Sequence, residues 1–362
     1  MILVKIHLIK QLFMKLFHHL FYSVIISVSL FSCVATSSTN IEVMKPADIT
    51  VAPSILKLGI VDRSHPDKNG KAINVLEGLV SGEGLFQDKY SFAEAVTGLT
   101  SGLSKSQRYS IFQIPGVTLY NNGGTSFSPI LSWELVKELC LKNNVDALLV
   151  LEIFDTDKSL KWSTETNSVT RNGITQNELY QVAKMNVSVT AGWRIYDPAT
   201  MTVVDEYRTY ETSSSSGKGL TTYDAEKNLP QYSNEVAKLA RINGEKYALR
   251  IAPTPMTVLR SYYTGGDERM KLAKVLMRDK KYEEATKLYE AVSTSAEKPK
   301  VRGRAFHNIA LIHEVTGSID KAIEFAEKAV AEGNKSSVSY LNTLKQRKLD
   351  DEKAKQQLIN VK

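Results

Sequence analysis

The sequence predicts an α+β protein in which a mixed β-sheet domain with packed helices is followed by an all-α helical repeat domain. Residues 54–264 alternate apolar strands with amphipathic helices, a pattern typical of a sheet covered by helices. Beyond residue 265 the chain is highly charged, and small and apolar residues recur at helical spacing. A chain of 362 residues is long enough for two such domains.

The first 32 residues have the composition of a secretory signal peptide. Three lysines and no acidic residue precede an apolar run over residues 20–31, and Leu30–Cys33 then forms a lipobox, the lipidation signal of bacterial lipoproteins. We therefore predict that residues 1–32 are removed and that Cys33 carries the lipid. An uncleaved membrane anchor is the alternative, because about 18 apolar residues can span a bilayer. Whether translation starts at Met1 or Met14 stays open.

The charge and cysteine content bound the function. The formal net charge is +7, and loss of the three signal-peptide lysines leaves +4. This excess is too small and too evenly spread to indicate nucleic-acid binding. If lipid takes Cys33, Cys140 has no partner for an internal disulfide. Cys140 lies on the apolar face of a predicted helix, so we expect it to be a small core residue.

The predicted sheet domain spans residues 54–264 and follows a flexible tether, rich in Ser and Thr, over residues 33–53. Residues 145–154 are almost continuously apolar, which indicates a strand buried on both faces. The Ser-rich residues 213–218 are predicted as an exposed loop. The other predicted strands are residues 55–61, 108–114, 179–196, 201–211 and 256–263, the last as a final strand of the mixed sheet; the predicted helices are residues 71–80, 90–103, 132–143 and 233–251.

Three short segments of this domain resemble segments of known envelope proteins: Leu58–Asp62, Val145–Val150 and the Tyr196–Thr200 turn. Together with the order of elements, they make residues 54–262 resemble the amino-terminal α/β domains of TolB and of the curli-secretion lipoprotein. The whole chain resembles an uncharacterised lipoprotein family of Bacteroidota, in which such a domain precedes helical repeats. The function of that family is not established, so the resemblance implies an architecture and a location only.

Residues 265–335 resemble tetratricopeptide (TPR) repeats, and residues 336–362 are expected to add a capping helix and a charged tail. Ala285 and Ala322 occupy equivalent positions 37 residues apart, close to the usual period of 34. Small residues suit these positions because paired helices approach closely there. Lys280 stands at the turn of the first unit, where glycine is usual. An ordinary pair of helical hairpins is the alternative.

The sequence contains no complete motif for catalysis. His313-Glu314 begins like the helix of a zinc protease, but Gly317 stands where the second histidine is required. Asp155 and Asp157 form an acidic pair at a strand end, whereas a metal site needs several converging ligands. We therefore expect no catalytic residue, no metal and no cofactor, and a protein that is not an enzyme.

The TPR resemblance implies a partner-binding groove, because the first helix of each TPR unit lines a concave surface. In this chain, the side chains at those positions are a mixture of charged and adaptable apolar residues, and such a mixture suits a protein or peptide partner. The alternative is that these side chains pack on the sheet domain or on the last helix. By position, the predicted groove residues are Asp267, Met270, Lys274, Met277, Arg304, His307, Leu311 and Glu314.

These observations predict an envelope lipoprotein that is tethered to a bacterial membrane by its lipid, including palmitate, and that acts as a binding or scaffold module. The partner is expected to be a protein or peptide of the cell envelope, and not nucleic acid. The periplasmic side of the outer membrane is the favoured location, with the inner membrane as the alternative. Two other functions stay open: a cell-wall or glycan hydrolase, and a subunit of an oligomeric secretion or assembly complex.

Overall fold

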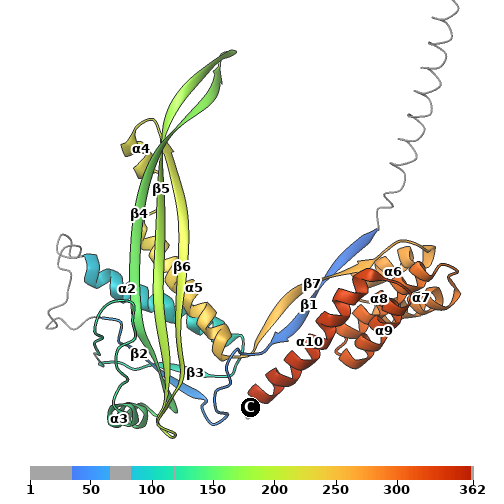
Figure 1. Ribbon diagram of the computed structural model, residues 1–362, viewed down its shortest axis with the longest axis horizontal. Coiled ribbons are helices and arrows are strands. Elements are labelled where there is room, and N and C mark those ends of the chain that lie inside the picture. Colours follow the sequence, from blue (N-terminus) through green and yellow to red (C-terminus); the bar gives the residue numbers. More distant parts are fainter. Residues whose placement is uncertain (1–34, 66–82, 118, 360–362) are drawn as a thin grey trace, which may run out of the picture. The chain divides into compact units, whose positions relative to one another are not determined.

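The computed structural model describes residues 35–65, 83–117 and 119–359 (Figure 1). The chain divides into two compact units, each built from two stretches of sequence. The sheet unit comprises Val43–Met256 and Leu349–Lys362, and the helical unit comprises Thr257–Lys348 with the residues up to Glu42. The predicted signal peptide, the predicted lipidation site Cys33 and the predicted helix over residues 71–80 lie outside the described residues.

A five-stranded mixed sheet with the order β3-β2-β4-β5-β6 forms the centre of the sheet unit. β2 runs parallel to β3 and β4, whereas β4, β5 and β6 are antiparallel neighbours. This sheet with its helices, followed by a run of helices, confirms the predicted fold class. The strands are β2 (Lys57–Asp62), β3 (Ser110–Gln113), β4 (Ala147–Arg171), β5 (Ile174–Asp197) and β6 (Thr202–Gly219).

Helices cover both faces of the sheet around the start of β4. Leu149 and Leu151 belong to a core formed with α2 and α5, whereas Leu148 and Val150 belong to a second core formed with α3. Because successive side chains of a strand point to opposite faces, the continuous apolar run of β4 is buried on both. Cys140 of α3 lies in the second core, as predicted, and burial raises the pKa of its thiol to about 12. The helices are α2 (Glu83–Ser104), α3 (Trp133–Asn143), α4 (Thr222–Lys227) and α5 (Tyr232–Ile251).

The β4–β5 hairpin is longer than the sequence analysis predicts. Its ladder continues to the pair Arg171–Ile174, where Asn172 and Gly173 make the turn with φ values of 52° and 79°. These left-handed values are those that a two-residue hairpin turn needs. β6 begins to pair with β5 only at Gln181, so the tip extends beyond the third strand (Figure 1). Residues 165–180 therefore form a two-stranded ribbon.

The Ser-rich residues 213–218 form the end of β6, so the prediction of an exposed loop is wrong. Ser213 to Lys218 pair in register with Val187 to Val182 of β5. A polar run can continue a strand because the ladder uses backbone groups. Gly217 and Gly219 also have a packing role, since a Cβ at either position would overlap backbone atoms of α4.

The predicted flexible tether contains a strand over about half of its length, so the prediction is wrong for residues 36–45. β1 (Thr36–Lys45) pairs with β7 (Thr254–Tyr263) in a separate two-stranded sheet. The first half of β1 alternates exposed and half-buried residues, and Ile41 is buried, so its Ser and Thr residues serve a strand. Because β7 pairs with β1 and not with the mixed sheet, the prediction that it is the final strand of that sheet is wrong.

Five helices follow β7 in the described part of the chain, and the last of them ends in the sheet unit. In order of sequence, α6 packs on α7, α7 on α8 and α8 on α9. Ala285 and Ala322, the two positions predicted to allow close helix contact, are fully buried. No helix among the described residues is both long enough and apolar enough to cross a membrane. The helices are α6 (Glu268–Arg278), α7 (Tyr282–Ser295), α8 (Pro299–Val315), α9 (Ile319–Ala331) and α10 (Lys335–Gln357).

The turns between these helices repeat the same backbone conformation. Lys280, Gly317 and Gly333 have φ values of 58°, 79° and 79°, in the left-handed region. The N–H of Lys281 donates to the carbonyl oxygen of Leu276, and 37 residues later the N–H of Ser318 donates to that of His313. Glycine adopts this conformation without strain. Lys280 is therefore the one position of the three where a side chain occupies a glycine conformation.

The last helix, α10, covers the residues predicted as a capping helix and continues through the highly charged end of the chain as far as Gln357. The side chain of Gln357 is buried against the start of the sheet unit. Its Oε1 accepts a hydrogen bond from the N–H of Ala47 at 2.8 Å, and its Nε2 donates to the carbonyl oxygens of Ala47 and Ile49 at 3.1 Å. The carbonyl of Gln357 accepts from Arg108 Nε at 3.0 Å. Because many residues near Gln357 in the sequence are charged, the sequence does not indicate that this side chain is buried.

Candidate binding groove in the helical unit

The open groove predicted from the TPR resemblance is not present in the form predicted. β7 and α10 cover this face of the first helices, as the alternative interpretation allows for the last helix. Among the eight predicted groove residues, Asp267 caps α6 by accepting a hydrogen bond from the N–H of Arg269, Arg304 is half-buried, and Lys274 is exposed. Five of the eight residues are buried in the helical unit: Met270, Met277, His307, Leu311 and Glu314.

Glu314 is the centre of a buried ionic network. Its carboxylate contacts Arg260 of β7 at 3.1 Å and Arg347 of α10 at 2.9 Å. It also accepts a hydrogen bond from the hydroxyl of Tyr340 at 2.7 Å. Burial, together with the charge of Glu314, raises the pKa of Tyr340 far above its ordinary value. Because a buried carboxylate must be paired, this network fastens β7 and α10 to α8.

His307 also connects α8 to both neighbours. Its Nε2 lies 3.2 Å from the carbonyl oxygen of Ser261, which can only accept, so Nε2 carries the proton of the neutral ring. Nδ1 then accepts from the hydroxyl of Ser337 at 2.9 Å. Burial lowers the pKa of His307, which favours this neutral form. Tyr263 and Tyr340 complete its surroundings, with ring centroids 5.1 and 4.8 Å away.

A cavity of about 550 Å³ opens above these residues, between β7 and α10. His307 and Tyr340 form part of its floor. The walls combine polar and apolar surface, and the side chain of Leu259, at 64% exposure, contributes to the apolar part. We call this cavity the β7–α10 groove. It is lined by Thr36, Leu259, Arg260, Ser261, Tyr262, Tyr263, His307, Ser336, Ser339, Tyr340 and Thr343.

One edge of β7 faces α8 and this groove. Asn308 imitates a neighbouring strand at Tyr263: its Oδ1 accepts from the backbone N–H at 2.8 Å, and its Nδ2 donates to the carbonyl at 2.7 Å. His307 binds the carbonyl of Ser261 on the same edge. Backbone groups point to the same edge at every second residue of a strand, so those of Leu259 also face this side. The sequence predicts β7 but contains no sign of which edge α8 covers.

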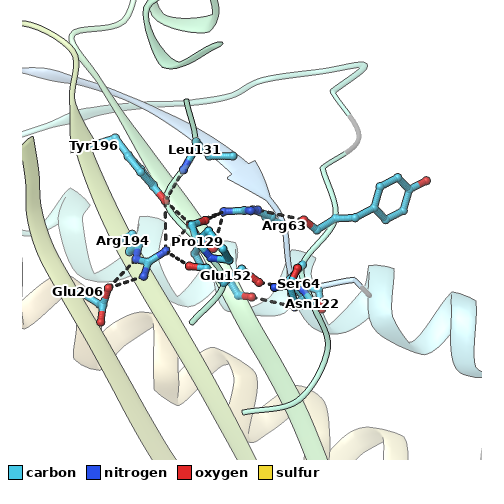
Figure 2. Close-up of polar contacts among 12 residues, drawn as sticks. Arg63, Ser64, Asn122, Pro129, Leu131, Glu152, Arg194, Tyr196 and Glu206 are labelled. Carbon is cyan, nitrogen blue, oxygen red and sulfur yellow. Dashed lines mark hydrogen bonds and ion pairs between the residues drawn. The ribbon is translucent and has the colours of Figure 1, made fainter. Parts of the chain in front are cut away.

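The sheet unit has a second buried polar cluster, centred on Glu152 of β4 (Figure 2). The Glu152 carboxylate accepts from the hydroxyl of Tyr196 at 2.5 Å and lies 3.1 Å from Arg63 and 3.6 Å from Arg194. Arg194 also binds Glu206 through Nε at 2.7 Å. Burial and the adjacent carboxylate raise the pKa of Tyr196 to about 12.

This cluster attaches a long loop to the sheet. Arg63 donates to the carbonyls of Tyr120 and Pro129, and Arg194 donates to that of Ser128. A hydrolase of glycans would need one carboxyl group that is protonated near neutral pH and within reach of substrate. Glu152 is fully buried, and its carboxylate is already engaged by the Tyr196 hydroxyl and by Arg63 and Arg194. Its position therefore suits a structural role.

Both members of the predicted acidic pair lie on one strand of the structure. Asp155 and Asp157 lie at consecutive outward positions of β4, and burial, followed by the charge of Asp157, raises the pKa of Asp155. Among the described residues, no group of three or more His, Cys, Asp or Glu side chains is placed to hold a metal ion.

The chain belongs to the family described as "Domain of unknown function (DUF8603)", whose model matches residues 55–263. A second family model, "Domain of unknown function (DUF6340)", matches residues 271–352. The two matches fall on the mixed sheet with its helices and on the run of helices that follows. No curated protein matches the chain.

Two solved structures from Paraburkholderia phytofirmans are similar to part of the chain. A PelC dodecamer covers 59% of this chain and 99% of its own, with 11% identity and a TM-score of 0.23. A dodecamer of a PelC variant covers 59% and 98%, with 12% identity and a TM-score of 0.21. Similarity this low supports no statement about function.

Proposed function

We propose that this chain is a lipid-anchored protein of a bacterial envelope that binds an extended peptide segment of a protein partner. The β7–α10 groove is the binding site in this proposal, in place of the concave groove predicted from the sequence. The observation that carries the proposal is a 550 Å³ groove beside β7, whose edge has no neighbouring strand at Leu259 among the described residues. The groups of the same edge at Ser261 and Tyr263 are already bonded to His307 and Asn308, so the partner strand would pair at Leu259 and before it. Extended peptides bind proteins by adding a strand to such an edge, while side-chain pockets give specificity.

The groove supplies the other contacts that a peptide needs. Ser336, Ser339 and Thr343 lie on one side of α10, and their hydroxyl groups can donate to or accept from peptide groups. Leu259 offers an apolar contact to a partner side chain. The floor is held rigid by the bonds of His307, so the site is pre-formed.

The lipid anchor is supported by the lipobox Leu30–Cys33 and by the structure that follows it. β1 starts at Thr36, three positions after Cys33, and it belongs to an ordered sheet. A Cys33→Ala variant should lose palmitate labelling and stay in the supernatant when membranes are sedimented, because the lipid supplies the apolar surface for membrane binding. Equal palmitate labelling and equal membrane retention of the variant would contradict the anchor.

Site-specific photo-crosslinking tests the groove. A photoreactive residue at Thr343, inside the groove, should crosslink the partner in intact cells, whereas one at Asn342, exposed on the neighbouring face of α10, should not. A second change, Ser339→Trp, should abolish the crosslink from Thr343 by filling the groove, with Asn342→Trp as the matched control. Equal crosslinking with both tryptophan variants would show that the partner binds elsewhere.

Assembly of several copies is a second candidate function, because the sheet unit has long strand edges. β2 pairs with β4 only at Ala147–Leu151, so the β4 edge from Ile153 to Arg171 has no neighbouring strand among the described residues. Unpaired edges of this length favour pairing with another chain. Light scattering of the detergent-extracted protein distinguishes the candidates: a mass of several chains supports assembly, and the mass of one chain contradicts it.

A further inference from the structure

A second cavity of the helical unit, of about 490 Å³, lies between β1 and α6. Its lining contains three cationic side chains and no acidic one. We call it the β1–α6 pocket. It is lined by Ser37, Ser38, Thr39, Asn40, Tyr262, Lys274, Val275, Met277, Arg278 and Lys280.

Two of the three cations are available to a ligand. Arg278 is bound to Asp279, with its Nε 3.0 Å from Oδ1. Lys274 and Lys280 form no ion pair with any described residue, and both are exposed. Lys280 occupies the left-handed turn position where Gly317 and Gly333 stand in the later turns. The ammonium group is therefore present at a position where the backbone favours glycine.

The opposite wall of the pocket comes from β1. Ser37 and Thr39 are half-buried and share one face of the strand with buried Ile41. Both residues belong to the lining, and their hydroxyl groups can donate hydrogen bonds. Cations combined with hydroxyl donors match the oxygens of a phosphate group, which carries negative charge and accepts several hydrogen bonds.

The pocket also lies near the predicted point of membrane attachment. Ser37 follows Cys33 by four positions, and an extended chain advances about 3.3–3.6 Å per residue, so its wall lies within about 14 Å of the predicted lipidated residue. Attraction between basic residues and an anionic membrane surface falls off over a Debye length of about 8–10 Å. The covalent anchor would thus hold this pocket within reach of phospholipid headgroups.

We propose that the β1–α6 pocket binds the phosphate of an anionic phospholipid headgroup at the membrane surface. This inference rests on the proposed lipid anchor. Lys274 and Lys280 would contact the phosphate oxygens, with Ser37 and Thr39 as hydrogen-bond donors. Headgroup binding would add a second, charge-dependent contact to the single covalent one, and so fix the orientation of the helical unit on the membrane.

Lysine labelling with an amine-reactive reagent, measured residue by residue by mass spectrometry, tests the site. Labelling of Lys274 and Lys280 should slow several-fold when the acylated full chain is moved from phosphatidylcholine vesicles to vesicles containing phosphatidylglycerol. Lys287, an exposed lysine outside the lining, should be labelled equally in both. Equal rates for Lys274 and Lys280 in the two vesicles would overturn the inference. So would slowing by inorganic phosphate alone without any effect of the anionic vesicles.

Lys280→Gly is the sharpest variant, because glycine adopts this backbone without strain while the side chain with its ammonium group is lost. The variant should lose most of the slowing at Lys274, whereas Lys287→Ala should retain it. Full retention of the slowing in Lys280→Gly would overturn the pocket as the site.

A last arm separates this inference from the lipid anchor. Short-chain phosphatidylglycerol, added below its micelle concentration, should slow labelling of Lys274 in detergent-extracted protein whether or not Cys33 is acylated. Slowing without palmitate labelling would keep the pocket and remove the anchor. Palmitate labelling without slowing would keep the anchor and remove the pocket.

Discussion

At the scale of single residues, one buried carboxylate in each unit is matched to partners on neighbouring elements. Glu314 and Glu152 each lie between two arginines and a tyrosine hydroxyl. Isolated buried carboxylates would be strongly unfavourable, whereas these fasten separate elements to one another. Stability therefore depends on particular polar residues as well as on apolar burial.

Tyr196→Phe should lower the free energy of unfolding of the sheet unit by about 1.5–3 kcal/mol, the usual contribution of a hydrogen bond to a charged group. The change removes the hydroxyl that donates to Glu152 at 2.5 Å and leaves the ring in place. Denaturant unfolding measures the loss. Tyr210→Phe, at a side chain with 65% exposure, is the control and should change little. Equal effects of the two variants would contradict the role given to the Tyr196 hydroxyl.

His307 should make the stability of the helical unit depend on pH. Burial lowers its pKa in the folded state below the unfolded value of about 6.5. The unfolded chain then binds the proton first, so the free energy of unfolding should fall as pH drops below about 6.5 and be insensitive to this group above it. Urea unfolding at several pH values measures the slope. His307→Gln should show a smaller slope than the native chain, and identical slopes would contradict the prediction.

At the scale of elements, the apolar patterns predict the positions of helices and strands well, but not the partners of the strands. The run at residues 145–154 predicts the doubly buried start of β4, and the helix predicted over residues 132–143 is α3, which Ser132 caps. The Asn172-Gly173 turn carries a strong hairpin signal, yet its flanking residues are polar, so apolar alternation could not extend the hairpin to it.

The same limit explains the candidate site. The 37-residue spacing predicts the helices and their turns, because local backbone and alanine positions determine both. It cannot show that β7 and α10 close over α8, since those contacts join residues far apart in sequence. His307 and Glu314 are polar at positions that suit a groove, and only the structure shows Arg260, Tyr340 and Ser337 covering them.

Ala322→Glu should strongly destabilise the helical unit, because α9 is fully buried at this position. Overpacking alone costs about 1–3 kcal/mol, and burial of an unpaired charge adds to it. Circular dichroism during thermal unfolding measures the effect. Lys321→Glu, at the exposed neighbouring position, is the control and should have a small effect. An unchanged melting curve for Ala322→Glu would contradict the repeat register.

Shortening the β4–β5 hairpin should leave the sheet unit folded. Thr164 and Gln181 are directly opposite each other, so an Asn-Gly turn can join them in place of residues 165–180. None of the removed side chains is buried, so the free energy of unfolding should change by no more than about 1 kcal/mol. Thermal unfolding gives the result. A larger loss would mean that the tip stabilises the rest of the unit.

At the scale of the whole molecule, each unit depends on distant parts of the chain. Gln357→Ala should lower the stability of the sheet unit by about 1–3 kcal/mol, because it leaves buried backbone groups of Ala47 and Ile49 without their partner. Denaturant unfolding, followed by the fluorescence of Trp193 in the sheet core, measures the loss. Gln356→Ala, at an exposed neighbour, is the control. An equal loss in the control would indicate a general effect on α10.

The contribution of Gln357 to the first strands of the sheet unit also has a consequence for biosynthesis. Domains near the N-terminus generally fold while the rest of the chain is still being made. Here the sheet unit begins at Val43, but one of its buried hydrogen-bonding side chains is the sixth residue from the end of the 362-residue chain. The nascent sheet unit therefore cannot reach its final state before residue 357 has been made and has left the ribosome. A chain that stays incompletely folded until then is also a chain that an export machinery can still thread.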